Sequence, residues 1–214
     1  VRFERQGGGK EAIENAAKLL SKAKFPVILS GAGVVLGGAI DECKKLAEKL
    51  DAPVCNGYQH NDSFPGSHPL AVGPLGYNGS KAAMELISKA DVVLALGTRL
   101  NPFSTLPGYG IDYWPKKATI IQVDMNPDRI GLTKKVSVGI CGDAKQVAQQ
   151  ILDKLSSDAG NTGREERKNL IHKTKSAWLQ TLSGLDHEED DPGTVWNKEA
   201  RERDKDRMSP RQAW

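Results

Sequence analysis

The chain alternates between short, uninterrupted apolar runs and longer stretches in which apolar residues recur at helical spacing. The runs Val27–Leu29 and Val92–Leu96 contain no polar residue and are bounded by turn signals. Such runs are typical of strands that are buried on both faces of a parallel sheet. The stretches with helical spacing cover residues 10–24, 36–50, 80–89 and 143–156. This alternation predicts an α/β fold, a doubly wound, Rossmann-like parallel sheet of about six strands with helices on both faces.

Two long segments between these elements are predicted to be irregular. Residues 56–78 are rich in Gly, Asn, His and Pro, and residues 101–117 hold Phe103, Tyr109, Tyr113 and Trp114. We expect these aromatic residues to pack beneath the second segment rather than to form a cofactor cage. Strands are predicted at 27–30, 52–55, 91–96, 119–123 and 136–140.

The pattern changes beyond residue 158. Residues 161–214 carry 11 basic and 11 acidic residues, with one credible helix over 163–182. The rest is predicted to be a charged linker that is mobile in isolation beyond about residue 186. Ser209 and Pro210 suit the N-cap and the first position of a new helix, and the chain opens without Met, so we expect a piece of a longer protein. We divide it into an N-terminal linker (1–9), a Rossmann-like domain (10–157), a helix and charged linker (158–208), and the beginning of a further domain (209–214).

Composition excludes several classes of function. The formal net charge is +3, without a basic stripe, which argues against nucleic-acid binding. No apolar run reaches the roughly 20 residues of a membrane span, and there is no signal-peptide core. Cys43, Cys55 and Cys141 have no metal-ligand spacing and are expected to be buried. We therefore expect a cytoplasmic protein.

Candidate binding residues follow the predicted strands, because ligands of such sheets sit outside the carboxyl ends of the strands. Glycines let the backbone approach a pyrophosphate, Asp124 could accept from a ribose or ribityl hydroxyl, and Arg99 could pair with a phosphate. In the other interpretation the glycines only form tight turns, since Leu36 stands where GxGxxG requires its third glycine, and Asp143 is the N-cap of a helix. No catalytic or metal-binding residue is predicted. The candidate nucleotide-binding residues are Gly31, Ala32, Gly33, Gly97, Thr98, Arg99, Asp124, Asn126, Gly142 and Asp143.

Several of these segments, taken in order, resemble the central domain of acetolactate-synthase-like thiamine-diphosphate enzymes. They are Phe25–Gly33, His68–Gly79, Ala90–Leu100, and Ile121–Pro127 with Gly142-Asp143. The resemblance covers about residues 8–156. Within this family, Asn101–Gly110, Asp128–Leu132 and Met208–Ala213 are similar to the sulfoacetaldehyde acetyltransferases.

The resemblance implies a parent enzyme that uses thiamine diphosphate and Mg²⁺, both bound by flanking domains that this chain lacks. That enzyme would convert sulfoacetaldehyde and phosphate into acetyl phosphate and sulfite, as a homodimer or homotetramer. The chain itself would be a non-catalytic domain, inactive alone. The alternatives are the same domain of an acetolactate synthase, an oxalyl-CoA decarboxylase or a glyoxylate carboligase relative, or a free-standing nucleotide-binding module.

One departure bears on the ligand of this domain. Flavin-binding members of the family carry Phe-Asp-Asp after Gly-x-Arg, whereas this chain has Leu100-Asn101-Pro102. We therefore expect an ADP-like or FAD-like ligand to bind weakly or not at all, and no tightly held flavin.

Overall fold

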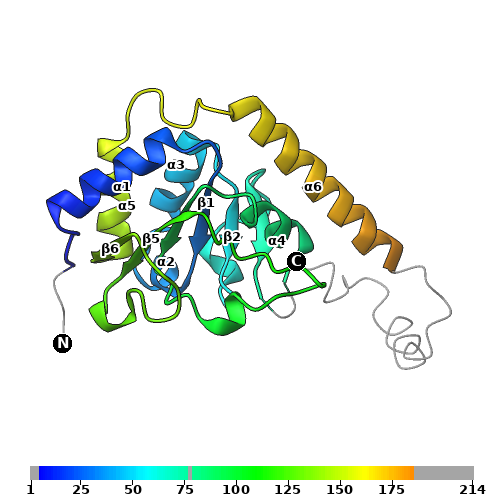
Figure 1. Ribbon diagram of the computed structural model, residues 1–214, viewed down its shortest axis with the longest axis horizontal. Coiled ribbons are helices and arrows are strands. Elements are labelled where there is room, and N and C mark those ends of the chain that lie inside the picture. Colours follow the sequence, from blue (N-terminus) through cyan, green and yellow to red (C-terminus); the bar gives the residue numbers. More distant parts are fainter. Residues whose placement is uncertain (1–4, 77–78, 186–214) are drawn as a thin grey trace.

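A six-stranded, all-parallel sheet forms the centre of the computed structural model, which describes residues 5–76 and 79–185. The strand order is β3-β2-β1-β4-β5-β6, and every neighbouring pair is parallel (Figure 1). The predicted α/β fold is confirmed. The predicted mobile linker and the predicted beginning of a further domain lie outside the described residues. The strands are β1 (Pro26–Ser30), β2 (Val54–Asn56), β3 (Ala71–Pro74), β4 (Val92–Leu96), β5 (Thr119–Asp124) and β6 (Val138–Cys141).

The helices form two layers around this sheet. Helices α1 (Lys10–Lys22), α3 (Ile40–Leu50) and α5 (Ala144–Lys154) pack against one another and against β1, β5 and β6. Helix α4 (Lys81–Ile87) packs on β2 and β3, and α6 (Arg164–Leu185) lies outside α4. Right-handed crossovers place α3 and α4 on opposite faces, because the chain moves one way from β1 to β2 through α3 and the other way from β3 to β4 through α4.

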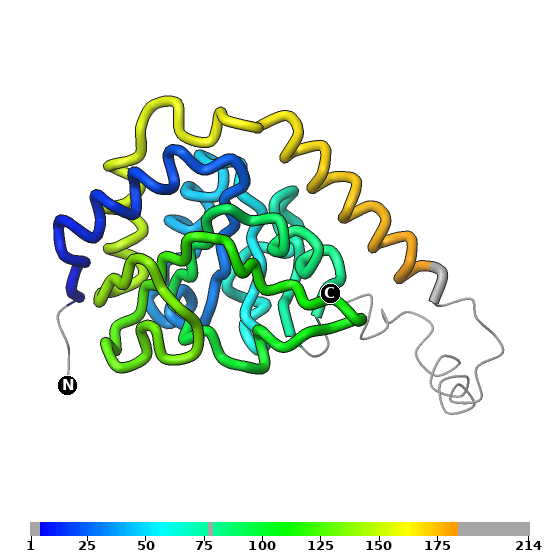
Figure 2. Tube along the Cα trace, viewed as in Figure 1, coloured from blue at the N-terminus to red at the C-terminus, as the bar shows by residue number. Residues whose placement is uncertain are grey.

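The connections from β4 to β5 and from β5 to β6 contain no α-helix. They run as irregular segments beside the sheet, with only the single 3-10 turns η2 (Pro102–Ser104) and η3 (Pro127–Arg129) (Figure 2). Buried residues of these segments, such as Leu100 and Tyr113, complete the core where a helix is lacking. This half of the sheet therefore carries two long loops that can reach its carboxyl edge.

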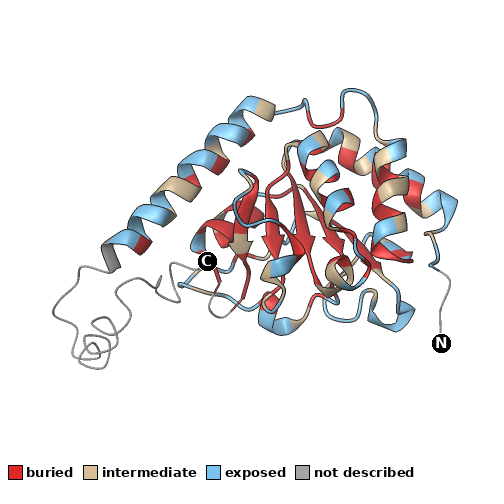
Figure 3. Cartoon of the chain, turned by 180° about the vertical axis from the view of Figure 1, so that it is seen from behind, coloured by how far each residue is buried: buried red, intermediate tan, exposed pale blue. Residues whose placement is uncertain are grey.

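The core is centred on β1 and β4, which are buried along their whole length (Figure 3). Cys43 and Cys55 are buried as predicted, and burial raises the pKa of the Cys43 thiol to about 12. The prediction was wrong for Cys141, which is exposed. Cys141 ends β6, an edge strand, so one side of it has no neighbouring strand to cover it.

Two predicted elements differ from the structure. The helix predicted over 36–50 begins later, as α3 at Ile40, and a short additional helix, α2 (Ala32–Leu36), precedes it. Gly38, between the two helices, adopts a φ of +62° that ends α2. The predicted loop over 56–78 contains β3, whose Gly73 and Pro74 do not resemble a strand sequence. An edge position tolerates a proline, since one side of the strand has no partner.

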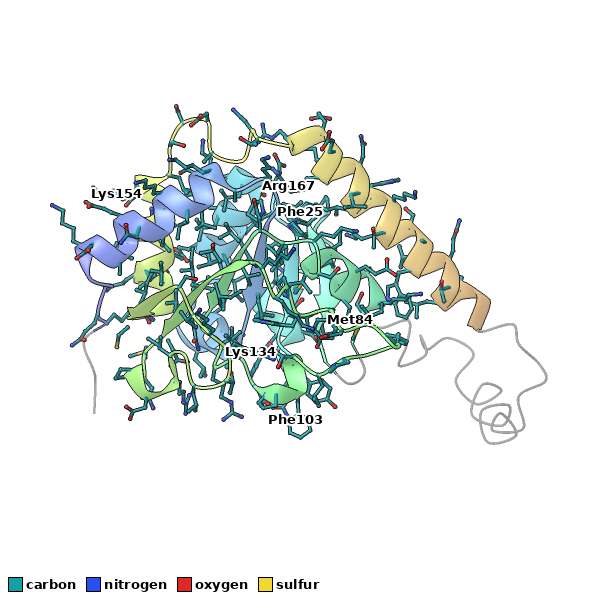
Figure 4. The ribbon with its side chains drawn as sticks, viewed as in Figure 1. Phe25, Met84, Phe103, Lys134, Lys154 and Arg167 are labelled. Atoms are coloured by element: carbon teal, nitrogen blue, oxygen red, sulfur yellow. The ribbon has the colours of Figure 1, made fainter. Side chains whose placement is uncertain are left out.

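Arg167 attaches α6 to the amino-terminal edge of the sheet (Figure 4). Its side chain is only 1% exposed. The guanidinium donates five hydrogen bonds of 2.5–2.9 Å to backbone carbonyl oxygens. The acceptors are Lys24, Leu50, Asp51, Gly160 and Thr162.

Candidate functional site: a cavity at the carboxyl edge of the sheet

A cavity of about 940 Å³ lies where the carboxyl ends of the strands meet. Sequence reasoning predicted ligand contacts at this edge, and the structure brings nine of the ten candidate residues to the cavity wall. Asn126 is not part of the wall, because its side chain accepts from the Asp128 amide at 2.9 Å and caps η3. The nine residues are Gly31, Ala32, Gly33, Gly97, Thr98, Arg99, Asp124, Gly142 and Asp143.

The glycines at the floor of the cavity allow two backbone segments to touch. A Cβ on Gly33 would lie 2.7 Å from the Gly97 Cα, and Gly97 has a φ of +61°. The amides of Gly31, Gly33 and Gly97 already donate to the carbonyl oxygens of Leu96, Gly97 and Val123. Close packing of the two turns therefore leaves these three amides paired within the protein.

The arginines at the cavity that lie outside any ion pair of the described residues come from two loops on neighbouring strands. Arg99 follows β4 and Arg129 lies in η3 after β5, and both are exposed. Within the described part of the chain, neither forms an ion pair. Asp124, at the end of β5, uses Oδ1 to accept from the Asn126 amide at 2.9 Å. The two guanidinium groups are thus the available partners for an anionic ligand.

The segment before α1 closes one side of the cavity. Arg5 donates to the Gly37 carbonyl at 2.5 Å and lies 3.5 Å from Asp143 Oδ1. Asp143 is 4% exposed, and its Oδ1 also accepts from the Lys145 and Gln146 amides. The interpretation of Asp143 as the N-cap of α5 is confirmed. Its carboxylate is committed to the protein itself.

Sequence reasoning missed the loop after β2, which supplies Gly57, Tyr58, Gln59 and His60 to the wall. Asn56 holds this loop by donating to Ser63 Oγ at 2.9 Å and to the His60 carbonyl at 3.3 Å. The Tyr58 amide donates to Ser104 Oγ at 3.1 Å, which links the loop to η2. The sequence could have predicted this loop as part of the wall only from its position, because it also follows the carboxyl end of a strand.

Apolar side chains stand around the cavity, and two of them, Phe103 and Leu106, come from a loop that was not expected to contribute. Leu36, Phe103, Leu106 and Met125 line it, and each is exposed. The prediction that the aromatic residues of 101–117 pack beneath their loop holds for Tyr113, which is 1% exposed. It was wrong for Phe103, which η2 presents outward (Figure 4), and for Tyr109, which lies beyond η2 and is exposed as well.

The arrangement suits binding of a ligand. It offers an apolar margin, two guanidinium groups and the carboxylate of Asp124. Across residues 5–76 and 79–185, no group of three or more His, Cys, Asp or Glu residues could hold a metal ion. The helices of those residues include none long and apolar enough to cross a membrane.

Comparisons with known proteins identify a family, sequence relatives and a solved structure that are similar to this chain. The family model of the thiamine pyrophosphate enzyme central domain matches residues 13–151. A probable sulfoacetaldehyde acetyltransferase of Rhizobium meliloti is 78% identical over all 214 residues, and the chain covers 36% of that relative. A probable acetolactate synthase large subunit of Methanocaldococcus jannaschii is 36% identical over 173 residues, which are 81% of this chain and 27% of that relative. The crystal structure of benzoylformate decarboxylase from Polynucleobacter necessarius superposes with a TM-score of 0.62 at 23% identity, over 76% of this chain and 30% of that one, and so supports the fold.

Proposed function

The chain belongs to the thiamine pyrophosphate enzymes as a central domain, and from this premise we propose that its parent is a sulfoacetaldehyde acetyltransferase. The observation that supports this most is the 78% identity to the Rhizobium meliloti relative along the whole chain, against 36% to the acetolactate synthase relative. The parent reaction would convert sulfoacetaldehyde and phosphate into acetyl phosphate and sulfite. The chain spans about a third of the length of the former relative, so the remaining two thirds would carry the chemistry.

Thiamine diphosphate and Mg²⁺ do not fit the described residues of this chain, in which no group of three or more His, Cys, Asp or Glu residues could hold a metal ion. Asp143, within Gly142-Asp143-Ala144, uses its Oδ1 for two helix amides and Arg5, as an N-cap does. We therefore assign the cofactor to the flanking domains of the parent and a non-catalytic role to this one. We further propose that the parent is a homodimer or homotetramer in the cytoplasm.

An activity assay distinguishes the parent from its alternatives. The longer protein that contains this chain is expected to release sulfite and acetyl phosphate when given sulfoacetaldehyde, phosphate, thiamine diphosphate and Mg²⁺. The 214-residue chain alone should release neither. Formation of acetolactate from pyruvate, without sulfite release from sulfoacetaldehyde, would instead support an acetolactate synthase, and turnover by the isolated chain would contradict its non-catalytic role.

A second function concerns the cavity itself. We propose that it binds a phosphate-bearing ligand of the ADP or FAD type weakly, because Arg99 and Arg129 stand unpaired, within the described residues, beside a cavity of about 940 Å³. Asp124 would face the sugar hydroxyls, and Arg99 the phosphates. The Gly31–Gly33 and Gly97-Thr98 turns would form the floor, and Gly142 and Asp143 one wall; Asn126 would act only by shaping η3.

Calorimetric titration with ADP, FAD and coenzyme A tests this binding function. Weak binding of one of these ligands is expected, without a yellow, flavin-loaded protein after purification. The substitution Arg99→Ala should weaken the binding by about 1.5–3 kcal/mol, the range for a hydrogen bond to a charged group. Submicromolar affinity for FAD would contradict the expected weak binding, and unchanged affinity in Arg99→Ala would contradict the proposed site.

A further inference from the structure

Gln122 is a polar residue in the middle of a buried strand. It lies on β5 between aliphatic residues and is only 1% exposed. Its partners in register are Ala95 on β4 and Gly139 on β6. Both neighbours are small, which leaves room beside the sheet for the longer amide side chain. A buried amide is costly unless it is fully hydrogen-bonded, so its partners indicate its role.

The side chain of Gln122 bonds to both loops that carry the cavity arginines. Its Nε2 donates to the Thr98 carbonyl at 3.2 Å and to the Arg129 carbonyl at 3.1 Å. Its Oε1 accepts from the Gly131 amide at 2.9 Å. One amide group therefore joins the residue before Arg99 to Arg129 itself, and both of its N–H groups have a partner.

Two further contacts support the same junction. Thr133 Oγ1 donates to the Leu100 carbonyl at 2.8 Å, so residues 129–133 and 97–100 are linked a second time. A Cβ on Gly139 would lie 2.6 Å from Ile130 Cγ2, so the absence of a side chain on β6 lets Ile130 pack against the sheet. The two loops thus form one hydrogen-bonded unit that rests on β5 and β6.

We propose that Gln122 is a positioning residue that fixes Arg99 and Arg129 relative to each other, so that both guanidinium groups can bind one phosphate-bearing ligand. The proposal rests on the proposed binding function of the cavity. Gln122 does not itself line the cavity and acts through the two loops. Without its three hydrogen bonds, each arginine would have to be ordered when the ligand binds, and affinity would fall by the cost of that ordering.

The test compares Gln122→Met, which keeps the size of the side chain and removes its hydrogen bonds, with Gln122→Glu, which keeps only an acceptor. The matched control is Gln180→Met, at an exposed glutamine of α6. Titrations of the purified proteins with ADP and with inorganic pyrophosphate should show about tenfold weaker binding for both Gln122 variants. The control should bind as tightly as the unsubstituted protein. Since the carboxylate of Gln122→Glu would face two carbonyl oxygens, that variant should bind no better than Gln122→Met.

A double-mutant cycle separates positioning from a merely structural role. In a protein that already carries Arg99→Ala and Arg129→Ala, adding Gln122→Met should change the residual affinity less than about twofold. An equal loss in both backgrounds, or full affinity in Gln122→Met, would overturn the proposal.

Amide hydrogen exchange gives an answer that does not depend on the ligand. Gln122→Met should speed exchange at Gly131 and across residues 97–100, without a matching change in β1. If Gln122→Met folds poorly, Thr133→Ala takes its place in the test, because Thr133 lies outside the core and links the same two loops. It should speed exchange at the same amides, but less. If the unsubstituted protein binds neither ADP nor pyrophosphate, the proposed binding function is wrong. The amide exchange rates are then the remaining test of whether Gln122 positions the two loops. Unchanged exchange in both loops would then overturn its positioning role.

Discussion

Gly33 and Gly97 touch where the first and fourth strands end, and neither position leaves room for a side chain. The nearest atoms to a Cβ on Gly33 all belong to the backbone of Gly97, at 2.7–3.3 Å. Backbone atoms cannot rotate away as a side chain can. An added methyl group must therefore push the two turns apart, and it must do so beneath the cavity.

The substitution Gly33→Ala is expected to lower the free energy of unfolding by about 2 kcal/mol, within the range for overpacking a filled site. Urea denaturation followed by circular dichroism measures this change. Gly66→Ala is the matched control, because a Cβ on Gly66 meets no atom within 4 Å. Equal stability of the two variants would show that the turns can separate at little cost.

At the scale of elements, α6 is attached in part through Arg167, a buried charged residue whose hydrogen-bond acceptors are all neutral groups. The five acceptors of Arg167 are backbone carbonyls, and two of them, Leu50 and Asp51, lie at the carboxyl end of α3. That end carries the negative pole of the helix dipole, which favours a cation there. Burial nevertheless lowers the pKa of Arg167. Further along α6, the ring of Trp178 contacts Tyr109 edge to face, with centroids 5.6 Å apart.

Replacing Arg167 with Met should leave these carbonyls without donors and release the beginning of α6. We expect a loss of about 3 kcal/mol in the free energy of unfolding, the upper range for unsatisfied buried polar groups. Arg167→Lys should recover part of it, since an ammonium has three donors in place of five. Lys173→Met, at an exposed position of α6, is the control for urea denaturation. A stable Arg167→Met protein would mean that water replaces the guanidinium.

The elements that the sequence predicted correctly are those whose local pattern has one explanation. The runs that became β1 and β4 have the length and composition of buried strands, and Asp143 is an N-cap in sequence and in structure. The strand β3 was not predictable, because its pairing with β2, and not its composition, makes it a strand. Likewise Arg129 was not predicted as a cavity residue, and its loop is joined by Gln122 to that of Thr98, which is distant in sequence.

For the whole molecule, two buried thiols and one buried phenol make the free energy of unfolding vary with pH in the alkaline range. Burial raises the pKa of the Cys43 thiol to about 12, although a hydrogen bond with Ser30 offsets part of this effect. Burial also raises the pKa of the Cys55 thiol and that of the Tyr113 hydroxyl. Below the ordinary thiol pKa of 9.0, both folded and unfolded chains keep these protons. Above it the unfolded chain releases them first, so the free energy of unfolding falls as pH rises from 9 toward 12.

Each buried thiol should lower the free energy of unfolding at pH 10, relative to pH 8, by on the order of 1 kcal/mol. Urea midpoints at the two pH values measure the change. The variant Cys43→Ala should show a smaller difference between the two pH values, whereas Cys141→Ala, at the exposed cysteine, should match the unsubstituted protein. An unchanged difference in Cys43→Ala would mean that this thiol ionises freely in the folded state.

The strand order also sets a sequence of events in folding. Residues 26–74 build β1, β2 and β3, residues 92–141 build β4, β5 and β6, and the pairing of β1 with β4 joins the two halves in one sheet. Contacts within each half close shorter loops than the pairing of Pro26 with Val92, so each half can gain structure before they meet. The cavity takes its walls from both halves and does not exist until this docking is complete. A ligand of the cavity would therefore not bind chains in which the two halves are still separate. It would bind the assembled sheet and lower the rate at which the halves separate.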